Sequence, residues 1–383
     1  MKNTIQLTKK LISLTSYKDG KQNEKPVSDF LYSFMCKQFP HLAVSAQKVA
    51  KNRYNIFATD RFPTKLLVVN QIDTVPPSLL WNTDPFTPKE TEKNIIGLGA
   101  TDSKGNIAAF LSALLQCGNT KGLALLWYVD EESQFAGMKY FVQSKEAKKI
   151  NPKHVLSIDG NGCALGTSCR GVMECTIRIS DTPKHSAQAK KNILIDFFDV
   201  ILKTQKYIQT FSSKTLGKPT INIATVQSGC VKKKSVSNYT FQNQGNITPE
   251  MIEALVEIRT IPEITGKEIV QKIKEYAKDR DIKNIDIDIH FDETGFETKR
   301  NTLEPIQKSI TQSIGGTIYL DPKNFGYLDI AMLKQIYPNT ALCSFGVGVP
   351  GQAHAPNEYI SKTNLQKGEA VYKQILKNLT TTP

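Results

Sequence analysis

An apolar run that ends in three consecutive carboxylates constrains this chain more than any other stretch. Residues 123–129 read Leu-Ala-Leu-Leu-Trp-Tyr-Val, and Asp130, Glu131 and Glu132 follow them directly. A short apolar run closed by charge is typical of a buried strand. In an open α/β sheet, ligands bind at the carboxyl ends of the strands, and three adjacent negative charges favour a cation among them. By itself, the same triplet would also suit a plain surface turn.

Three further apolar strands are predicted to end in side chains that can bind a metal. They are residues 65–70 before Gln71 and Asp73, residues 155–158 before Asp159, and residues 341–348 before a loop that contains His354. Asp102 precedes a predicted helix that starts after Gly105 and stops at Gly118. If the strands share one sheet, these side chains meet at one edge of it. Oxygen ligands with an imidazole suit zinc, manganese or cobalt.

The middle of the chain follows a different pattern. The predicted order is strand (173–179), helix (193–207), strand (220–226), strand (254–259), helix (267–277) and strand (285–290). This β-α-β-β-α-β order is typical of a ferredoxin-like domain. The sequence therefore predicts an α/β fold in three segments. We expect residues 1–170 and 292–383 to form one domain, and residues 171–291 to form an inserted domain.

The composition argues against nucleic-acid and membrane partners. The chain of 383 residues has a formal charge of +13, but its lysines are scattered and the tightest run is Lys232 to Lys234. No aromatic-interleaved basic stripe accompanies this charge, so no nucleic-acid partner is predicted. Neither a signal-peptide core nor an apolar run of about 18 residues is present, so no membrane span is expected. Seven cysteines without a CxxC pair favour buried thiols and a cytoplasmic location.

Six motifs, in order along the chain, resemble those of the metal-dependent aminoacylase/carboxypeptidase family. They are Asp73-Thr-Val-Pro76, Trp81-x-x-Asp-Pro-Phe86, Gly97-x-Gly99-x-x-Asp102-x-Lys-Gly105, Asp130-Glu-Glu132, Lys184-His-Ser186 and Ala353-His-x-Pro-Asn-Glu358. The family includes acetylornithine deacetylase and succinyl-diaminopimelate desuccinylase, and the details resemble the former more. The resemblance implies a three-layer αβα zinc-peptidase-like catalytic domain with an inserted ferredoxin-like α+β lid and dimerisation domain.

The same resemblance implies a role for each candidate site residue. Among the metal ligands, Asp102 would bridge two metal ions, Glu132 and His354 would complete one site, and Asp159 would bind in the other. Glu131 would be the general base, and Asp73 would orient a neighbouring ligand. His185 would polarise the substrate carbonyl, and Arg259 would pair with a substrate carboxylate. The metal would be one or two Zn²⁺, with Co²⁺ or Mn²⁺ as alternatives, and the chain would form a homodimer through the inserted domain. Plain interpretations stay open for two residues: His185 as a surface histidine and Arg259 in a strand-end salt bridge.

One position departs from the family pattern. The family has histidine two residues before the equivalent of Asp73, as a ligand of the second metal, and this chain has Gln71 there. The carbonyl oxygen of Gln71 could still be a ligand while its NH2 group donates to Asp73. An amide oxygen is a weaker and harder ligand than imidazole, so the second metal site is expected to be weakened. Asp159 is a milder departure, since a glutamate is more usual there.

The predicted function is metal-dependent hydrolysis of the amide bond of an N-acylated amino acid. N-acetylornithine is the first expected substrate, which would give ornithine and acetate in arginine biosynthesis. Three alternatives stay open. They are a succinyl-diaminopimelate desuccinylase, a small-peptide hydrolase, and a non-catalytic relative whose second metal site is impaired at Gln71.

Overall fold

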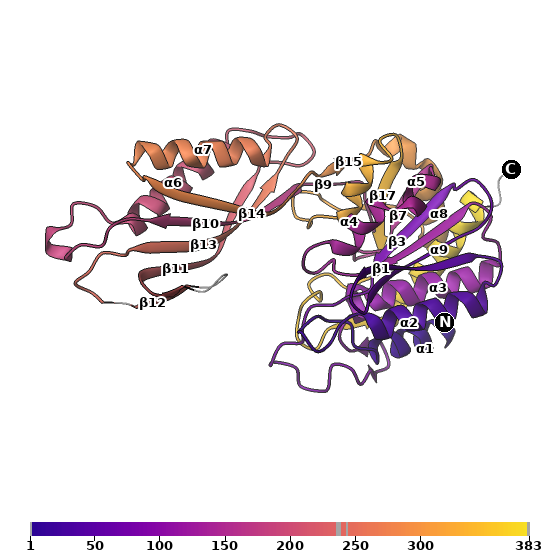
Figure 1. Ribbon diagram of the computed structural model, residues 1–383. Helices are drawn as coiled ribbons and strands as arrows, with labels where there is room; N and C mark the ends of the chain where they lie inside the picture. Colours follow the sequence, from indigo (N-terminus) through magenta and orange to yellow (C-terminus); the bar gives the residue numbers. More distant parts are fainter. Residues whose placement is uncertain (1, 235–238, 243, 381–383) are drawn as a thin grey trace. The chain divides into compact units, whose positions relative to one another are not determined.

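The chain divides into two compact units, each with its own sheet and helices (Figure 1). The computed structural model describes residues 2–234, 239–242 and 244–380. The main unit comprises Met1–Ser168, Glu297–Asp321 and Leu328–Pro383, and the inserted unit comprises Cys169–Phe296 and Pro322–Tyr327. The chain passes between the units at two short strands that pair with each other, β9 (Ser168–Cys169) and β15 (Phe296–Glu297), and again at the two ends of Pro322–Tyr327.

An eight-stranded sheet in the order β1-β2-β6-β3-β7-β17-β8-β16 forms the centre of the main unit. Its strands are β1 (Ala43–Ala50), β2 (Arg53–Thr59), β3 (Leu66–Gln71), β6 (Leu123–Tyr128), β7 (His154–Ser157), β8 (Ala164–Gly166), β16 (Ile318–Tyr319) and β17 (Ala341–Gly346). The four central strands β6, β3, β7 and β17 run parallel to one another, and β2 and β8 flank them as antiparallel neighbours. Every residue of β3, β6 and β17 is buried, as is usual for parallel strands covered on both faces.

Helices cover both faces of this sheet, so the main unit has three layers. The long helices are α1 (Lys2–Ile12), α2 (Lys25–Gln38), α3 (Gly105–Cys117), α8 (Glu304–Ile314) and α9 (Lys362–Thr380), and they share one apolar core with one face of the sheet. There the ring of Phe110 on α3 packs edge-on against Trp127 of β6. The other face carries α4 (Ala136–Gln143), α5 (Lys145–Lys149) and the 3-10 turn η4 (Asp329–Gln335). On that face Phe57 packs on Phe141 of α4. The three-layer αβα prediction is confirmed.

Shorter elements complete the main unit. They are β4 (Lys89–Glu90), β5 (Asn94–Ile96) and β18 (Tyr359–Ser361), which pair in a three-stranded sheet, the π-helical turn η1 (Ala100–Lys104), and the 3-10 turn η3 (Arg300–Leu303). Helix α3 ends at Gly118, as predicted: this glycine has a φ of 67° and its N–H donates to the carbonyl of Leu114.

The inserted unit has the predicted ferredoxin-like topology. Its elements are β10 (Gly171–Ser180), the 3-10 turn η2 (Ser186–Gln188), α6 (Ile193–Ile208), β11 (Thr220–Lys234), β12 (Tyr239–Gln242), β13 (Met251–Thr260), α7 (Gly266–Asp279) and β14 (Asn284–Glu293). The sheet order β12-β11-β13-β10-β14 is antiparallel between all neighbours. Thr265 begins α7 with a capping box, because its hydroxyl accepts from the Glu268 N–H and the Glu268 carboxylate accepts from the Thr265 N–H. The side chains of Lys233 and Lys234, from the basic run noted above, lie outside the described residues.

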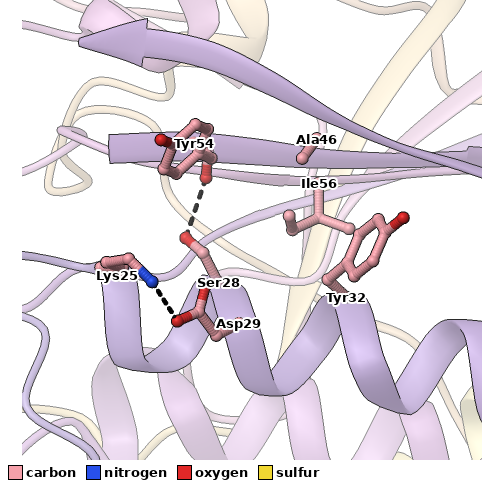
Figure 2. A pocket seen from close by; sticks show the side chains of 7 residues that line it. All are labelled: Lys25, Ser28, Asp29, Tyr32, Ala46, Tyr54 and Ile56. Carbon is pink, nitrogen blue, oxygen red and sulfur yellow. Dashed lines mark hydrogen bonds and ion pairs between the residues drawn. The ribbon is translucent and has the colours of Figure 1, made fainter. Parts of the chain in front are cut away.

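Two further features bear on function. Within the described part of the chain, none of the helices is both long enough and apolar enough to cross a membrane. A pocket of about 220 Å³ lies between α2 and the β1–β2 hairpin, with Tyr32, Tyr54 and Ile56 among its lining residues (Figure 2). None of the predicted site residues lines this pocket.

Candidate active site

The four central strands bring most of the predicted site residues to one edge of the main sheet. Gln71 ends β3 and Asp73 follows it, Glu131 and Glu132 follow β6, Asp159 follows β7, and His354 lies in the loop after β17. Because β6, β3, β7 and β17 are parallel neighbours, their carboxyl ends lie side by side. The prediction that these strands share one sheet is confirmed.

Three of the predicted site residues form a compact group. One ligand atom each from Asp102, Glu132 and His354 lies within 4.8 Å of the others, and no further group of this kind occurs among the described residues. The His354 Nε2 lies 3.1 Å from Glu132 Oε2 and 3.5 Å from Asp102 Oδ2. Hydrogen bonding to Asp102, and then to Glu132, raises the pKa of His354 to about 10. Two carboxylates and an imidazole of this spacing suit a divalent cation.

Asp102 lies in a backbone turn that a buried glutamate holds. The carboxylate of Glu358 accepts hydrogen bonds from the N–H groups of Gly99 (2.8 Å), Thr101 (2.7 Å) and Asp102 (2.9 Å). Glu358 is 1% exposed, and burial raises its pKa to about 7. The sequence motif contained Glu358, but sequence reasoning gave it no role. Its position at the end of the His354 motif was the only available signal.

Asp73 holds the turn that carries Glu131 and Glu132. Its two carboxylate oxygens accept the backbone N–H of Glu131 (3.2 Å) and of Glu132 (3.0 Å). Asp73 is buried, and this burial, reinforced by the negative charges of Glu132 and Glu24, raises its pKa well above the usual value. The aspartate therefore fixes the backbone of both glutamates.

The environment of Glu131 favours proton transfer. Burial, followed by the negative charges of Glu132, Asp329 and Asp159, raises the pKa of Glu131 well above its usual value. Asp329 was not found from the sequence, since it belongs to no motif, and its Oδ1 accepts a hydrogen bond from the hydroxyl of Tyr128 over 2.7 Å. A carboxylate with a raised pKa beside a metal-binding cluster suits a general base.

The structure corrects the expected contact of Gln71. We expected its NH2 group to donate to Asp73, but Nε2 donates to Asp102 Oδ1 over 2.9 Å. The reason is that both oxygens of Asp73 already accept backbone N–H groups. The carbonyl oxygen of Gln71 is buried and has no hydrogen-bond partner in the described part of the chain.

Asp159 lies near the cluster but outside the group of three. Its Oδ1 accepts the N–H of Gly160 over 2.7 Å. Burial is the main cause of its raised pKa, and the negative charge of Asp102 is the next. Its carboxylate oxygens are not among the ligand atoms of the group of three.

His185 and Arg259 belong to the inserted unit. His185 is exposed, and its Nδ1 accepts the N–H of Ala187 over 3.2 Å at the start of η2. Arg259 donates through Nε and Nη2 to the carboxylate of Glu257, at 2.9 Å and 3.0 Å. Arg259 thus already has a carboxylate partner, which is the strand-end salt bridge named above as its plain interpretation.

The donor set fits a divalent metal. Glu131, Glu132 and Asp159 each have a raised pKa to which neighbouring carboxylates contribute, so the site holds more negative charge than its own cations balance. A bound cation would offset this excess of negative charge.

Comparison with known proteins agrees with this fold and site. The protein family described as "Peptidase family M20/M25/M40" matches this chain over residues 67–378. A peptidase M20 domain-containing protein of Schizosaccharomyces pombe is 28% identical over 98% of this chain and 84% of its own length. The succinyl-diaminopimelate desuccinylase of Nautilia profundicola is 25% identical (98% and 99% covered), and the acetylornithine deacetylase of Photorhabdus laumondii is 26% identical (85% and 82% covered). An M20 metallo-carboxypeptidase of Sulfolobus solfataricus has the same fold, with a TM-score of 0.79, 17% identity and full coverage of both chains.

The fold and these relatives define a two-unit hydrolase with a candidate metal-binding group at the edge of its main sheet. The chain belongs to peptidase family M20/M25/M40, the metal-dependent aminoacylase and peptidase family that the motifs resemble.

Proposed function

We propose that this chain hydrolyses the amide bond of N-acylated amino acids, with N-acetylornithine as its preferred substrate. The observation that carries the proposal is the convergence of Asp102, Glu132 and His354 within 4.8 Å, beside the half-buried carboxylate of Glu131. Both a ligand set and a base of raised pKa are needed for this chemistry, and both lie at one sheet edge.

The proposed cofactor is a divalent cation, with Zn²⁺ first and Co²⁺ or Mn²⁺ as alternatives. Asp102, Glu132 and His354 would hold it, and Asp159 would reach it or a neighbouring ion. When bound, it would polarise the substrate carbonyl and make water easier to deprotonate. The weakened second site expected from Gln71 stays part of the proposal, since its NH2 group rather than its oxygen faces Asp102.

Glu131 is the proposed general base. Its carboxylate would accept a proton from the attacking water and pass it to the nitrogen of the leaving amine. Asp73 would support this step, because it fixes the Glu131 and Glu132 backbones through two hydrogen bonds. The products would be a carboxylate and a free amino acid.

The substrate class rests on the relatives and on the inserted unit. The desuccinylase and the deacetylase, at 25% and 26% identity, support an N-acyl amino acid and leave the acyl group open. Arg259 would bind a substrate carboxylate if it exchanged its Glu257 partner, because guanidinium binds carboxylates through two hydrogen bonds. His185 would donate to the substrate carbonyl.

The proposed partner is a second copy of the chain, docked through the inserted unit. Ile195 (67% exposed), Phe198 (41%) and Leu202 (55%) lie three and four residues apart on α6, which puts them on one face of the helix. An exposed apolar face of this kind suits a protein interface.

All seven cysteines are free thiols, which supports the predicted reducing, cytoplasmic location.

A substrate panel tests the proposed function. Metal-free protein would be reloaded with Zn²⁺, Co²⁺ or Mn²⁺ and assayed with N-acetylornithine, N-succinyl-diaminopimelate and a dipeptide. We expect the highest kcat/KM on N-acetylornithine. Preference for the succinylated substrate or the dipeptide would replace the substrate assignment, and silence on all three with metal bound would contradict it.

A further inference from the structure

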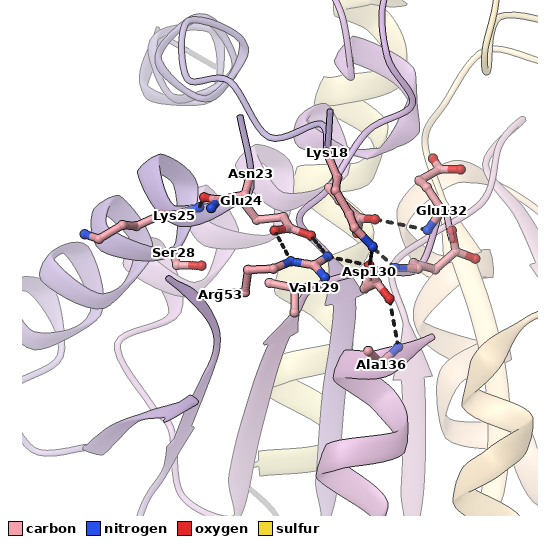
Figure 3. A network of polar contacts seen from close by, with 12 residues as sticks. Lys18, Asn23, Glu24, Lys25, Ser28, Arg53, Val129, Asp130, Glu132 and Ala136 are labelled. Atoms are coloured by element: carbon pink, nitrogen blue, oxygen red, sulfur yellow. Dashed lines mark hydrogen bonds and ion pairs between the residues drawn. The ribbon is translucent and has the colours of Figure 1, made fainter. Parts of the chain in front are cut away.

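The buried side chain of Arg53 contacts two carboxylates at once, those of Glu24 and Asp130 (Figure 3). Arg53, the first residue of β2, donates from Nε to Glu24 Oε2 over 2.8 Å, and from Nη2 to both Glu24 Oε1 and Asp130 Oδ1. The three side chains are 10%, 0% and 2% exposed. Lys18 adds a second cation, with Nζ 3.4 Å from Asp130 Oδ1.

Asp130 begins the turn that carries Glu131 and Glu132, and it is bonded to the residues at the end of that turn. Its φ of 70° lies in the left-handed region, which residues other than glycine adopt rarely. Its Oδ2 accepts the N–H of Ala136, the first residue of α4, over 3.3 Å. Its backbone carbonyl accepts the N–H of Phe135 over 2.8 Å. Asp130 thus ties the beginning of the turn to its end, and Arg53 fixes Asp130.

The charges of this network cancel. Arg53 and Lys18 carry two positive charges, and Glu24 and Asp130 carry two negative charges. This balance matters because the adjoining site is rich in carboxylates, and the charge of Glu24 already contributes to the raised pKa of Asp73. Without Arg53, two further buried carboxylates would lack their main counter-charge beside the site.

We propose that Arg53 and Asp130 are positioning residues for Glu131 and Glu132. They act through the backbone of the turn and hold one carboxylate in place for the cation and the other for water. The proposal rests on the proposed function for the identity of the reaction, but the geometry it concerns is that of metal binding. A purely structural ion pair would stabilise the fold and leave metal affinity unchanged, and this difference makes the two roles separable.

The first test is Asp130→Asn. An amide has one accepting oxygen, so it cannot accept both the Arg53 guanidinium and the Ala136 N–H. We expect Zn²⁺ or Co²⁺ to bind the metal-free variant about 10- to 100-fold more weakly in calorimetric titration, the usual cost of losing a residue that orients metal ligands. We also expect kcat to fall while KM stays unchanged.

The matched control is Asp60→Asn. Asp60 also uses both carboxylate oxygens, which accept the backbone N–H groups of Phe62 (2.9 Å) and Gly122 (2.6 Å) near the amino-terminal end of β6. We expect this variant to keep wild-type metal affinity. Metal affinity within about twofold of wild type in a folded Asp130→Asn protein would overturn the proposal.

A second variant covers the case in which Asp130→Asn does not fold. Arg53→Lys keeps the positive charge, but one ammonium cannot reproduce the planar fork that joins Glu24 to Asp130. We expect weaker metal binding than in Arg178→Lys, where the replaced arginine pairs with Glu253 in the inserted unit. A folded Arg53→Lys protein with wild-type metal affinity would contradict the proposal.

Titration of the metal alone separates this inference from the proposed function. If wild-type protein binds metal but hydrolyses none of the three substrates, the proposed function fails, and the loss of metal affinity in the variants still supports the positioning role.

Discussion

Gln71 donates a hydrogen bond from Nε2 to Asp102 Oδ1 over 2.9 Å, at the carboxylate proposed to bridge two metal ions. A proton donor thus lies where a second cation would need a ligand. The other end of the amide, Oε1, is buried without a hydrogen-bond partner among the residues described. We therefore expect one tightly bound metal, and a second ion would require the Gln71 amide to turn over.

Metal stoichiometry follows from this contact. We expect wild-type protein, dialysed against micromolar Zn²⁺, to retain one ion per chain in elemental analysis. Gln71→His replaces the amide with an imidazole nitrogen, a better zinc ligand, and should retain two ions. Gln47→His, which also replaces a buried glutamine of the main unit, should still retain one. Two tightly bound ions in the wild-type protein would contradict this account of Gln71.

Glu358 should be needed to hold Asp102. A glutamine at this position can offer only one accepting oxygen, so at least one of the N–H groups of Gly99, Thr101 and Asp102 loses its acceptor. We expect Glu358→Gln to lower the free energy of unfolding by about 1–3 kcal/mol in urea titration, the usual cost of a buried unsatisfied group.

Metal binding should weaken in the same variant, because the Asp102 backbone loses its anchor. Glu268→Gln, which perturbs the capping box of α7 in the inserted unit, should leave metal affinity unchanged. Equal metal affinity in Glu358→Gln and Glu268→Gln would contradict the role of Glu358 in holding Asp102 for metal binding.

Lys104 should make stability depend on pH. This side chain is 1% exposed, its ammonium donates to the Leu14 carbonyl over 2.7 Å, and burial lowers its pKa to about 7. The unfolded chain, with an ordinary lysine pKa near 10.5, binds more protons than the folded chain between about pH 7 and 10.5. This group therefore makes the free energy of unfolding rise with pH across that window, by at most about 1.4 kcal/mol per pH unit.

Replacement of Lys104 should remove this rise. We expect metal-free Lys104→Met to show a flatter stability profile than wild type between pH 7 and 10, measured by urea unfolding in the presence of a chelator. Lys121→Met, at an exposed lysine, serves as the control and should follow wild type. Parallel profiles for Lys104→Met and wild type would show that Lys104 keeps an ordinary pKa.

The apolar face of α6 should control assembly. Phe198→Asp combined with Leu202→Asp places two charges on this face, and we expect it to convert a dimer to a monomer in light scattering. Leu79→Asp, at a fully exposed leucine of the main unit (103%), should not change the mass. A wild-type protein that is already a monomer at micromolar concentration would refute the proposed interface.

The parts of the site that follow buried strands were predictable from sequence. Runs such as residues 123–129 are apolar because parallel strands are buried on both faces, and chemistry-bearing side chains follow them at the carboxyl edge. The hairpin of β1 and β2 escaped prediction, since β1 at the sheet edge has a single buried residue and no continuous apolar run.

The supporting residues could not be predicted for a different reason. Glu358 contacts the backbone of Gly99 and Asp102 across more than 250 residues of sequence, and Arg53 joins Glu24 to Asp130 across 29 and 77 residues. Such contacts follow no local periodicity. Which carboxylate accepts the NH2 group of Gln71 could not be predicted either, because it depends on the two backbone N–H groups that Asp73 accepts.

The proposed role of Glu131 can be tested by comparing wild type with Glu131→Gln at equal metal content. We expect both proteins to bind Zn²⁺ equally, since Glu131 is not one of the three clustered ligands. Hydrolysis of N-acetylornithine should fall at least about 100-fold in the variant, the usual contribution of a general base. Activity retained by metal-loaded Glu131→Gln, or wild-type activity that persists after complete metal removal, would contradict the account.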